Sequence, residues 1–215
     1  MDKYLKSLLL LAFAIVLIIG GSSTLNRSDD GSLEGVEVLA LVADGFDYKE
    51  FSEVKARLQS KGARVTAASF EAGMLQGDGG EYSPETTFDE IDAMDYDAFF
   101  IPGGNSPYNL IHHRFNVEEG HQTALDILTQ AHEERKLIAA ICHGPWVLAA
   151  ADLVNGTRVT CYIDPYLIAD LEKAGAVVDT GRLVVRDGLI ITGFGWDAIE
   201  SFASEIVRAL SSGAE

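Results

Sequence analysis

Short apolar runs alternate with segments of helical spacing along most of this chain. The runs are continuous, which is typical of strands buried on both faces of a parallel sheet. Strands are predicted over residues 36–43, 64–70, 97–102 and 137–141, with shorter candidates over 159–162, 176–178, 183–186 and 189–192. Helices are predicted over residues 48–60, 117–134, 144–151, 164–174 and 197–210. The pattern predicts an α/β fold with a mostly parallel sheet and helices on both faces.

A single domain is predicted over residues 36–211. The chain has 215 residues, 47% of them hydrophobic, which suits one sizeable core, and it contains no internal repeat. Residues 71–95 are rich in Gly, Asp, Glu and Thr, so we expect loops or a small hairpin there. Residues 24–35 are predicted to form a polar linker in front of the domain.

The first 23 residues have a separate character. Lys3 and Lys6 precede an apolar run within residues 7–21, and small residues follow it, which is the layout of a secretory signal. The run is short for a membrane-spanning helix, which needs about twenty apolar residues. Residues 1–23 are therefore predicted to be either a cleaved signal peptide or a short membrane anchor, and we expect a secreted or extracytoplasmic protein.

The charge balance excludes one class of partner. The chain has 16 basic and 33 acidic side chains and a net charge of −17, whereas phosphate recognition needs clustered Lys and Arg. No nucleic-acid partner is predicted. Cys142 and Cys161 could pair in an exported protein, but pairing would silence a working Cys142 thiol, so we expect both to be reduced.

The segment Cys142-His143-Gly144-Pro145 lies between two apolar runs. It follows a predicted strand and opens a helix, where a sharp turn exposes a nucleophile and the helix dipole lowers the pKa of a thiol. Gly144 allows the tight turn, and Pro145 suits a first helical turn. A free cysteine can also be a small buried hydrophobe, and His143 can be a turn residue that faces water.

Two further features are expected at the same edge of the sheet. Gly103 and Gly104 end another predicted strand, and glycines let the backbone approach a bound group closely. Glu50 lies near the start of the first helix and could reach this edge, although the spacing alone favours a solvated helix face for it. The edge therefore predicts a pocket for a carbonyl group beside Cys142.

The segments Ala140–Pro145 (AICHGP) and Ile101–Gly104 (IPGG) resemble the PfpI branch of the DJ-1/PfpI superfamily, and the similarity runs from Val36 to about Leu210. The resemblance implies a flavodoxin-like three-layer sandwich with a nucleophile elbow, assembled as a homodimer or a larger homo-oligomer. It assigns Cys142 as nucleophile, His143 as the neighbouring base and Glu50 as the acid beside the thiol. The Gly104 and His143 amides would form an oxyanion hole. It implies no metal or organic cofactor.

Tyr108 departs from the family pattern. Peptidase-like members carry a glutamate shortly after Pro-Gly-Gly that orients the histidine; a tyrosine can hydrogen-bond the imidazole but cannot supply that full negative charge. We therefore expect a cysteine-dependent enzyme on carbonyl substrates, either glyoxalase- or deglycase-like or a peptidase-like hydrolase. Its substrates would be small carbonyl compounds, which Tyr108 favours, or peptides and proteins. The alternative is a holdase chaperone or redox-sensing protein on the same fold.

Overall fold

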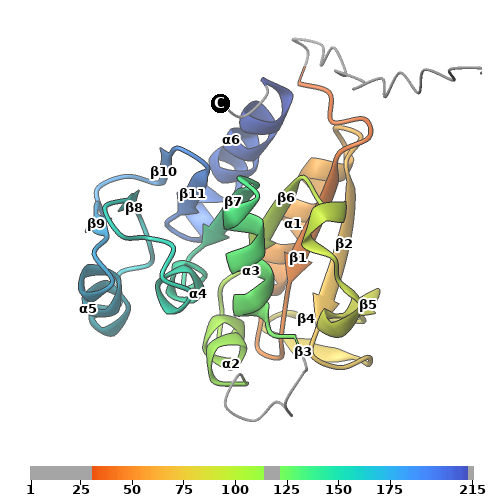
Figure 1. Cartoon of the computed structure of the whole chain (residues 1–215), viewed down its shortest axis with the longest axis horizontal. Helices are drawn as coiled ribbons and strands as arrows, with labels where there is room; N and C mark the ends of the chain where they lie inside the picture. The colour runs from red at the N-terminus through yellow and green to blue at the C-terminus, as the bar shows by residue number, and fades with distance from the viewer. Residues whose placement is uncertain (1–30, 114–121, 213–215) are drawn as a thin grey trace, which may run out of the picture.

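The computed structural model describes residues 31–113 and 122–212. The strands are β1 Glu37–Leu41, β2 Arg64–Ser69, β3 Leu75–Gly77, β4 Gly80–Tyr82, β5 Thr86–Thr87, β6 Ala98–Ile101, β7 Leu137–Ile141, β8 Arg158–Val159, β9 Val177–Val178, β10 Val184–Asp187 and β11 Ile190–Gly193. The α-helices are α1 Tyr48–Gln59, α2 Ser106–His113, α3 Ala124–Glu133, α4 Pro145–Ala150, α5 Pro165–Lys173 and α6 Ile199–Ser211. Strands and helices alternate as predicted (Figure 1).

The main sheet has seven strands in the order β10-β11-β7-β6-β1-β2-β5. All neighbouring pairs are parallel except β10 and β11. The carboxyl ends of β1, β6, β7 and β11 therefore share one edge of the sheet, where open α/β sheets bind ligands. The predicted hairpin within residues 71–95 is also present, because β3 and β4 pair antiparallel.

Helices cover both faces of the sheet (Figure 1). Val38 and Ala40 of β1 pack in the core that contains buried residues of α1 and α6, whereas Leu39 and Leu41 pack in the core of α3, α4 and α5. This alternation buries β1 on both faces and explains its continuous apolar run. The predicted three-layer α/β sandwich is confirmed.

Two helix predictions need correction. α3 begins at Ala124 rather than at residue 117, because Thr123 and Asp126 form a capping box that starts the helix there. α2 was missing from the predicted elements. It follows a Gly-Gly turn, and its eight residues are too few to show a clear helical spacing of apolar side chains. Its second residue is Pro107, which suits the first turn of a helix.

The end of the predicted polar linker belongs to the fold. Leu33 is fully buried against the core, and its N–H donates to the carbonyl oxygen of Lys61 at 2.7 Å. The linker prediction is therefore wrong for these last residues. The signal-peptide or anchor prediction for residues 1–23 falls outside the described residues. Within residues 31–113 and 122–212, none of the helices has the length and apolar character that crossing a membrane requires.

Candidate active site

Cys142 occupies a strained turn at the carboxyl end of β7. Its φ is +61°, a left-handed conformation that is uncommon for a residue with a side chain. Flanking hydrogen bonds hold it there: its N–H donates to the Gly193 carbonyl at 2.8 Å, and its carbonyl accepts from the Tyr162 N–H at 3.0 Å. The Gly144 N–H closes the turn on the Ile141 carbonyl at 2.7 Å. Strain supported in this way is typical of a functional site, and the predicted elbow is confirmed.

Glu50 lies beside this thiol and is fully buried. Asp47 caps α1 by accepting the Glu50 N–H at 2.9 Å, which fixes the first turn of the helix under the sheet edge. The Gly103 N–H donates to Glu50 Oε2 at 2.8 Å. Glu50 Oε1 is buried and receives no N–H or O–H hydrogen bond from the described residues. The solvated-face interpretation of Glu50 is therefore wrong.

Gly103 and Gly104 bring the backbone close to the thiol. A Cβ at Gly103 would lie 2.5 Å from the Cys142 Cβ and 2.7 Å from Glu50 Oε2, so no side chain fits there. Gly104 has a φ of +74°, and a Cβ on it would lie 2.3 Å from the Gly45 carbonyl oxygen. These glycines are required for contact between the loop after β6 and the elbow after β7.

Removal from water controls the protonation of the thiol and the carboxyl. Burial, reinforced by the nearby Asp47 carboxylate, raises the pKa of Glu50 to about 7. Burial and then the Glu50 carboxylate raise the pKa of the Cys142 thiol far above its usual range. The prediction of a lowered thiol pKa is wrong, because burial outweighs the dipole of the short helix α4. A negative charge on Glu50 disfavours a negative charge on the Cys142 thiol, and the reverse also holds. Above pH 7 the two groups together therefore keep one proton.

Two backbone amides act in the opposite direction on the thiol. The N–H groups of Gly104 and His143 donate to the Cys142 sulfur and favour its charged form. When the shared proton resides on Glu50, these amides stabilise the thiolate. They are also placed to stabilise an oxyanion on a carbon bonded to that sulfur. The structure thus brings Cys142, Glu50, Gly103, Gly104 and His143 together.

Asp164 is a site residue that the sequence analysis missed. His143 Nδ1 lies 3.4 Å from Cys142 Sγ, and His143 Nε2 lies 3.7 Å from Asp164 Oδ2. The Tyr162 ring flanks the imidazole, with ring centroids 5.1 Å apart. Asp164 also caps α5, accepting from the Tyr166 N–H at 2.8 Å. The predicted helix start at this residue gave the only signal, and nothing in it pointed towards His143.

Tyr108 lies elsewhere. Its ring stacks on that of His112, with centroids 3.8 Å apart, and it is 51% exposed. Together with Trp146 it lines a separate cavity between α2, α4 and α5. Among the described residues, the side chains of Cys142, Tyr162 and Asp164 contact the His143 imidazole, and that of Tyr108 does not.

The remaining chemistry of the site is simple. Cys142 and Cys161 are both free, as expected, and burial raises the pKa of Cys161 to about 12. No group of three or more metal-binding side chains occurs within residues 31–113 and 122–212. The arrangement offers a nucleophile, a buried proton carrier, an imidazole with a carboxylate behind it, and oxyanion-stabilising amides.

Comparisons with known proteins identify the family of this chain. The model of the DJ-1/PfpI family matches residues 36–209. Deglycase PfpI of Pyrococcus furiosus is 34% identical over 71% of this chain and 86% of its own length. Protein/nucleic acid deglycase 2 of Escherichia coli is 28% identical over 82% of this chain and 98% of its own length. The crystal structure of Drosophila melanogaster DJ-1beta is 26% identical, covers 82% of this chain and 90% of its own, and superposes with a TM-score of 0.71. The chain therefore belongs to the DJ-1/PfpI family.

Proposed function

We propose that this protein is a deglycase-like enzyme that removes dicarbonyl-derived adducts from amino or thiol groups, with Cys142 as nucleophile. The observation that carries the proposal is the shared-proton pair of Cys142 and Glu50 under the amides of Gly104 and His143. A half-buried thiol that exchanges its proton with a buried carboxyl can attack a carbonyl carbon and then return the proton. The Pyrococcus and Escherichia relatives are named deglycases, which supports the same reaction class.

The first step forms a bond from sulfur to carbon. With free methylglyoxal, the Cys142 sulfur adds to the aldehyde carbon, and the oxyanion takes the proton that the pair shared. With a methylglyoxal adduct of an amine, the same carbon–sulfur bond forms while the carbon–nitrogen bond breaks, and the proton leaves on the amine. Both routes give one hemithioacetal on Cys142. The Gly104 and His143 amides stabilise the negative oxygen on the way.

The second step is an internal proton transfer. Glu50 takes the proton from the carbon bonded to sulfur and delivers it to the neighbouring carbonyl carbon. The hydroxyl proton on the first carbon moves to the oxygen of the second, which completes the conversion of the hemithioacetal into a 2-hydroxy thioester. One carbon is oxidised and its neighbour reduced, so no external oxidant is needed. Water then hydrolyses the thioester to lactate and regenerates the thiol. His143, with Asp164 on its far nitrogen, is positioned to activate that water.

A second candidate is peptidase-like acyl transfer. The observation that favours it is the Cys142-His143-Asp164 arrangement, in which a carboxylate from the same chain lies behind the imidazole. Such a triad activates a thiol in cysteine hydrolases. The deglycase proposal ranks first because Glu50, which acyl transfer does not need, is buried against the nucleophile at a cost in desolvation.

The deciding experiment measures turnover with three substrates. Wild type and Cys142→Ser receive methylglyoxal, a methylglyoxal-treated lysine peptide and a fluorogenic peptide, and lactate, free amine and fluorescence are followed. We expect lactate and free amine from wild type and no product from Cys142→Ser. Release of fluorescence alone would replace the proposal with the peptidase. No turnover of any substrate, with suppression of client aggregation that survives in Cys142→Ser, would replace it with the holdase.

We also propose that the enzyme acts outside the cytoplasm, as a homo-oligomer. The proposal rests on the basic–apolar–small pattern of residues 1–23 and on the family resemblance. Cell fractionation with an antibody against the domain tests the location, and mass spectrometry of the N-terminus distinguishes a cleaved signal from a tether. Recovery of the full-length chain in the soluble cytoplasmic fraction would contradict export. Light scattering of the purified protein tests the oligomer, and a monomer would contradict it.

A further inference from the structure

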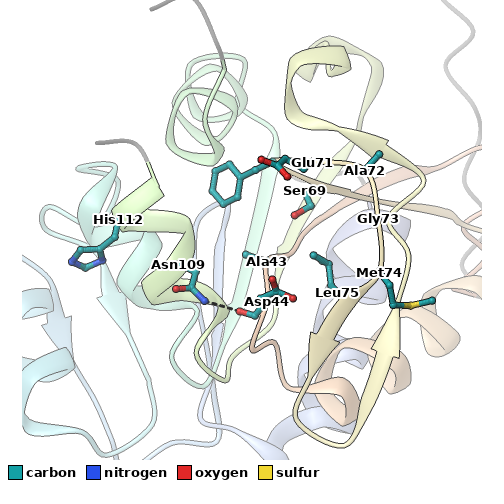
Figure 2. A pocket seen from close by; sticks show the side chains of 11 residues that line it. Ala43, Asp44, Ser69, Glu71, Ala72, Gly73, Met74, Leu75, Asn109 and His112 are labelled. Atoms are coloured by element: carbon teal, nitrogen blue, oxygen red, sulfur yellow. Dashed lines mark hydrogen bonds between the residues drawn. The ribbon is translucent and has the colours of Figure 1, made fainter. Parts of the chain in front are cut away.

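We propose that a cavity beside the active site binds a lysine or arginine side chain of a polypeptide substrate. The cavity has a volume of about 490 Å³ and lies at the carboxyl ends of β1 and β2, bounded by α2 and by residues 71–75 (Figure 2). We call it the acidic cavity, and its polar lining is Asp44, Ser69, Glu71, Asn109 and His112. The proposal rests on the deglycase function and names polypeptides with basic residues as its substrate class.

The charges around the acidic cavity select a cation. Among the described residues, its lining includes the carboxyl groups of Asp44 and Glu71 and no Lys or Arg. Asp44 Oδ1 accepts the Gln76 N–H at 2.8 Å, and the Glu71 carboxylate has no ion-pair partner among the described residues. Met74, which is 57% exposed, offers an apolar surface for the methylene stem of a long basic side chain. Ammonium and guanidinium groups match this lining.

Ser69 provides an independent sign that a ligand belongs here. It is only 2% exposed, and its hydroxyl makes no hydrogen bond with the described residues. Ser69 lines the cavity and lies between Glu71 and Asp44 in Figure 2. What remains accessible of this nearly buried hydroxyl opens onto the cavity, where it can accept a hydrogen bond from the N–H of a bound ligand.

His112 is the one lining group that could oppose a cation. Its Nδ1 lies 2.8 Å from the Tyr108 carbonyl oxygen, so that nitrogen carries a hydrogen in the neutral ring. The carboxyl groups that a bound cation would meet in the lining are those of Asp44 and Glu71.

The acidic cavity is joined to the active site. Asn109 Nδ2 donates to the Asp44 carbonyl at 2.8 Å, as the dashed line in Figure 2 shows, and the next carbonyl, that of Gly45, accepts the Asn105 N–H at 2.7 Å. Asn105 follows Gly104, whose amide faces the Cys142 sulfur. The loop that binds the oxyanion thus forms one continuous wall with the cavity.

The spacing between the two sites sets a rule for substrates. Cys142 follows β7, whereas the cavity follows β1 and β2, which are two and three strands away. At about 4.8 Å between strands, the separation is about 10–14 Å along the sheet edge. An extended peptide spans this in about three or four residues. A basic residue three or four positions from the modified residue is the arrangement that fits both sites.

The test is a binding measurement that does not depend on turnover. Two hexapeptides with an acetylated N-terminus and an amidated C-terminus are titrated into the ¹⁵N-labelled protein at pH 8 and low salt. One contains a single Lys as its only charged residue, and the other has Gln in that position. We expect the Lys peptide to bind about tenfold more tightly, with shifts of the Ala72 and Gly73 amides, as two charge-assisted contacts imply. Equal affinity of the two peptides would overturn the proposal.

Variants localise the effect. Asp44→Asn with Glu71→Gln keeps the shape of the cavity and is expected to abolish the preference for Lys, and Ser69→Ala is expected to reduce it about threefold. Glu53→Gln with Glu133→Gln removes the same charge from exposed helix positions outside the cavity and should keep the preference. If both double variants lose the preference for the Lys peptide equally, that preference comes from the net charge of the protein, and the proposal is overturned.

Turnover then tests the spacing rule. Methylglyoxal-modified peptides with Lys one to six positions from the adduct should show the highest kcat/KM at three or four positions, and that maximum should vanish in Asp44→Asn with Glu71→Gln. A flat series with active enzyme would overturn the spacing. If no modified peptide is turned over while the Lys preference in binding persists, the proposed function fails and the cation-binding cavity stands.

Discussion

The two sides of the Cys142 thiol differ in their access to water. On one side lies Glu50, which is fully buried. On the other lie His143 and Asp164, whose side chains are 24% and 30% exposed. Burial lets the inner carboxyl hold a proton near neutral pH, whereas the outer carboxyl acts through solvent-screened charge and hydrogen-bond geometry. The inner carboxyl therefore affects the protonation of the Cys142 thiol, whereas the outer carboxyl lies behind the His143 imidazole.

Adding a methyl group at Gly103, beside the Cys142 thiol and the Glu50 carboxyl, should have the largest effect on kcat/KM. Gly103→Ala places a methyl group 2.5 Å from the Cys142 Cβ and 2.7 Å from Glu50 Oε2, so the thiol and the carboxyl must separate. We expect kcat/KM for lactate formation to fall at least a hundredfold, since a displacement of about 1 Å costs that much. Gly181→Ala is the matched control, because its added Cβ lies 3.4 Å from Asp179 Oδ1. Activity of Gly103→Ala within threefold of wild type would contradict the close inner packing.

The cost of burying Glu50 should be visible in stability. Its pKa rises from 4.5 in the unfolded chain to about 7 in the fold, so its stabilising contribution is complete below pH 4.5 and is lost as the pH rises through 7. Glu50→Gln removes this titration. Between pH 5 and pH 8.5 the difference in unfolding free energy should move in favour of the variant by about 1–3 kcal/mol.

Urea unfolding at the two pH values measures this change. Glu53→Gln is the control, since Glu53 is an exposed residue of the same helix and should show little pH-dependent difference from wild type. A difference between Glu50→Gln and wild type that stays constant across the two pH values would mean that Glu50 does not hold a proton on folding.

Neutralising the outer carboxyl should have a smaller effect. Asp164→Asn keeps an acceptor for the Tyr166 N–H, so α5 stays capped, but it removes the negative charge behind His143. We expect kcat/KM to fall about three- to tenfold, with most of the loss in kcat, because a half-exposed ion pair is worth little more than 1 kcal/mol. Glu172→Gln, at an exposed position of α5, is a charge-matched control. A loss in kcat/KM greater than a hundredfold would contradict the smaller role assigned to Asp164 than to Glu50.

Changing Tyr108 should have almost no effect. Tyr108→Phe keeps the stack on His112 and removes only a hydroxyl that does not contact His143 in the described structure. We expect kcat/KM for methylglyoxal to stay within twofold of wild type. A tenfold loss would show that Tyr108 reaches the imidazole during turnover, as the sequence comparison with peptidase-like relatives suggested.

The layers of the fold could be predicted because burial leaves a periodic record. β1 and β7 read as continuous apolar runs since both of their faces are covered. α2 could not be predicted with the same ease, because its eight residues include Ser, Pro, Asn and two His. Leu33 was assigned to a polar linker since one buried residue among polar neighbours carries no period.

The site was predictable only where topology decides position. Cys142 and the two glycines follow neighbouring parallel strands, and the ends of such strands share an edge whatever the loops do. Glu50 needed the family resemblance, because its burial depends on the angle at which α1 enters. Asp164 approaches His143 through an irregular segment after β8, whose course no local pattern encodes. The raised thiol pKa depends on desolvation, which only the folded packing reveals.

The proton shared by Cys142 and Glu50 is tested most directly by the pH dependence of kcat/KM for lactate release from methylglyoxal, measured from pH 5 to 9. For wild type we predict that kcat/KM rises about tenfold per pH unit and levels off near pH 7. There the pair goes from two bound protons to one. In Glu50→Gln the inflection near pH 7 should disappear. An inflection that persists unchanged in Glu50→Gln, or a wild-type profile that is flat through pH 7, would contradict the shared proton.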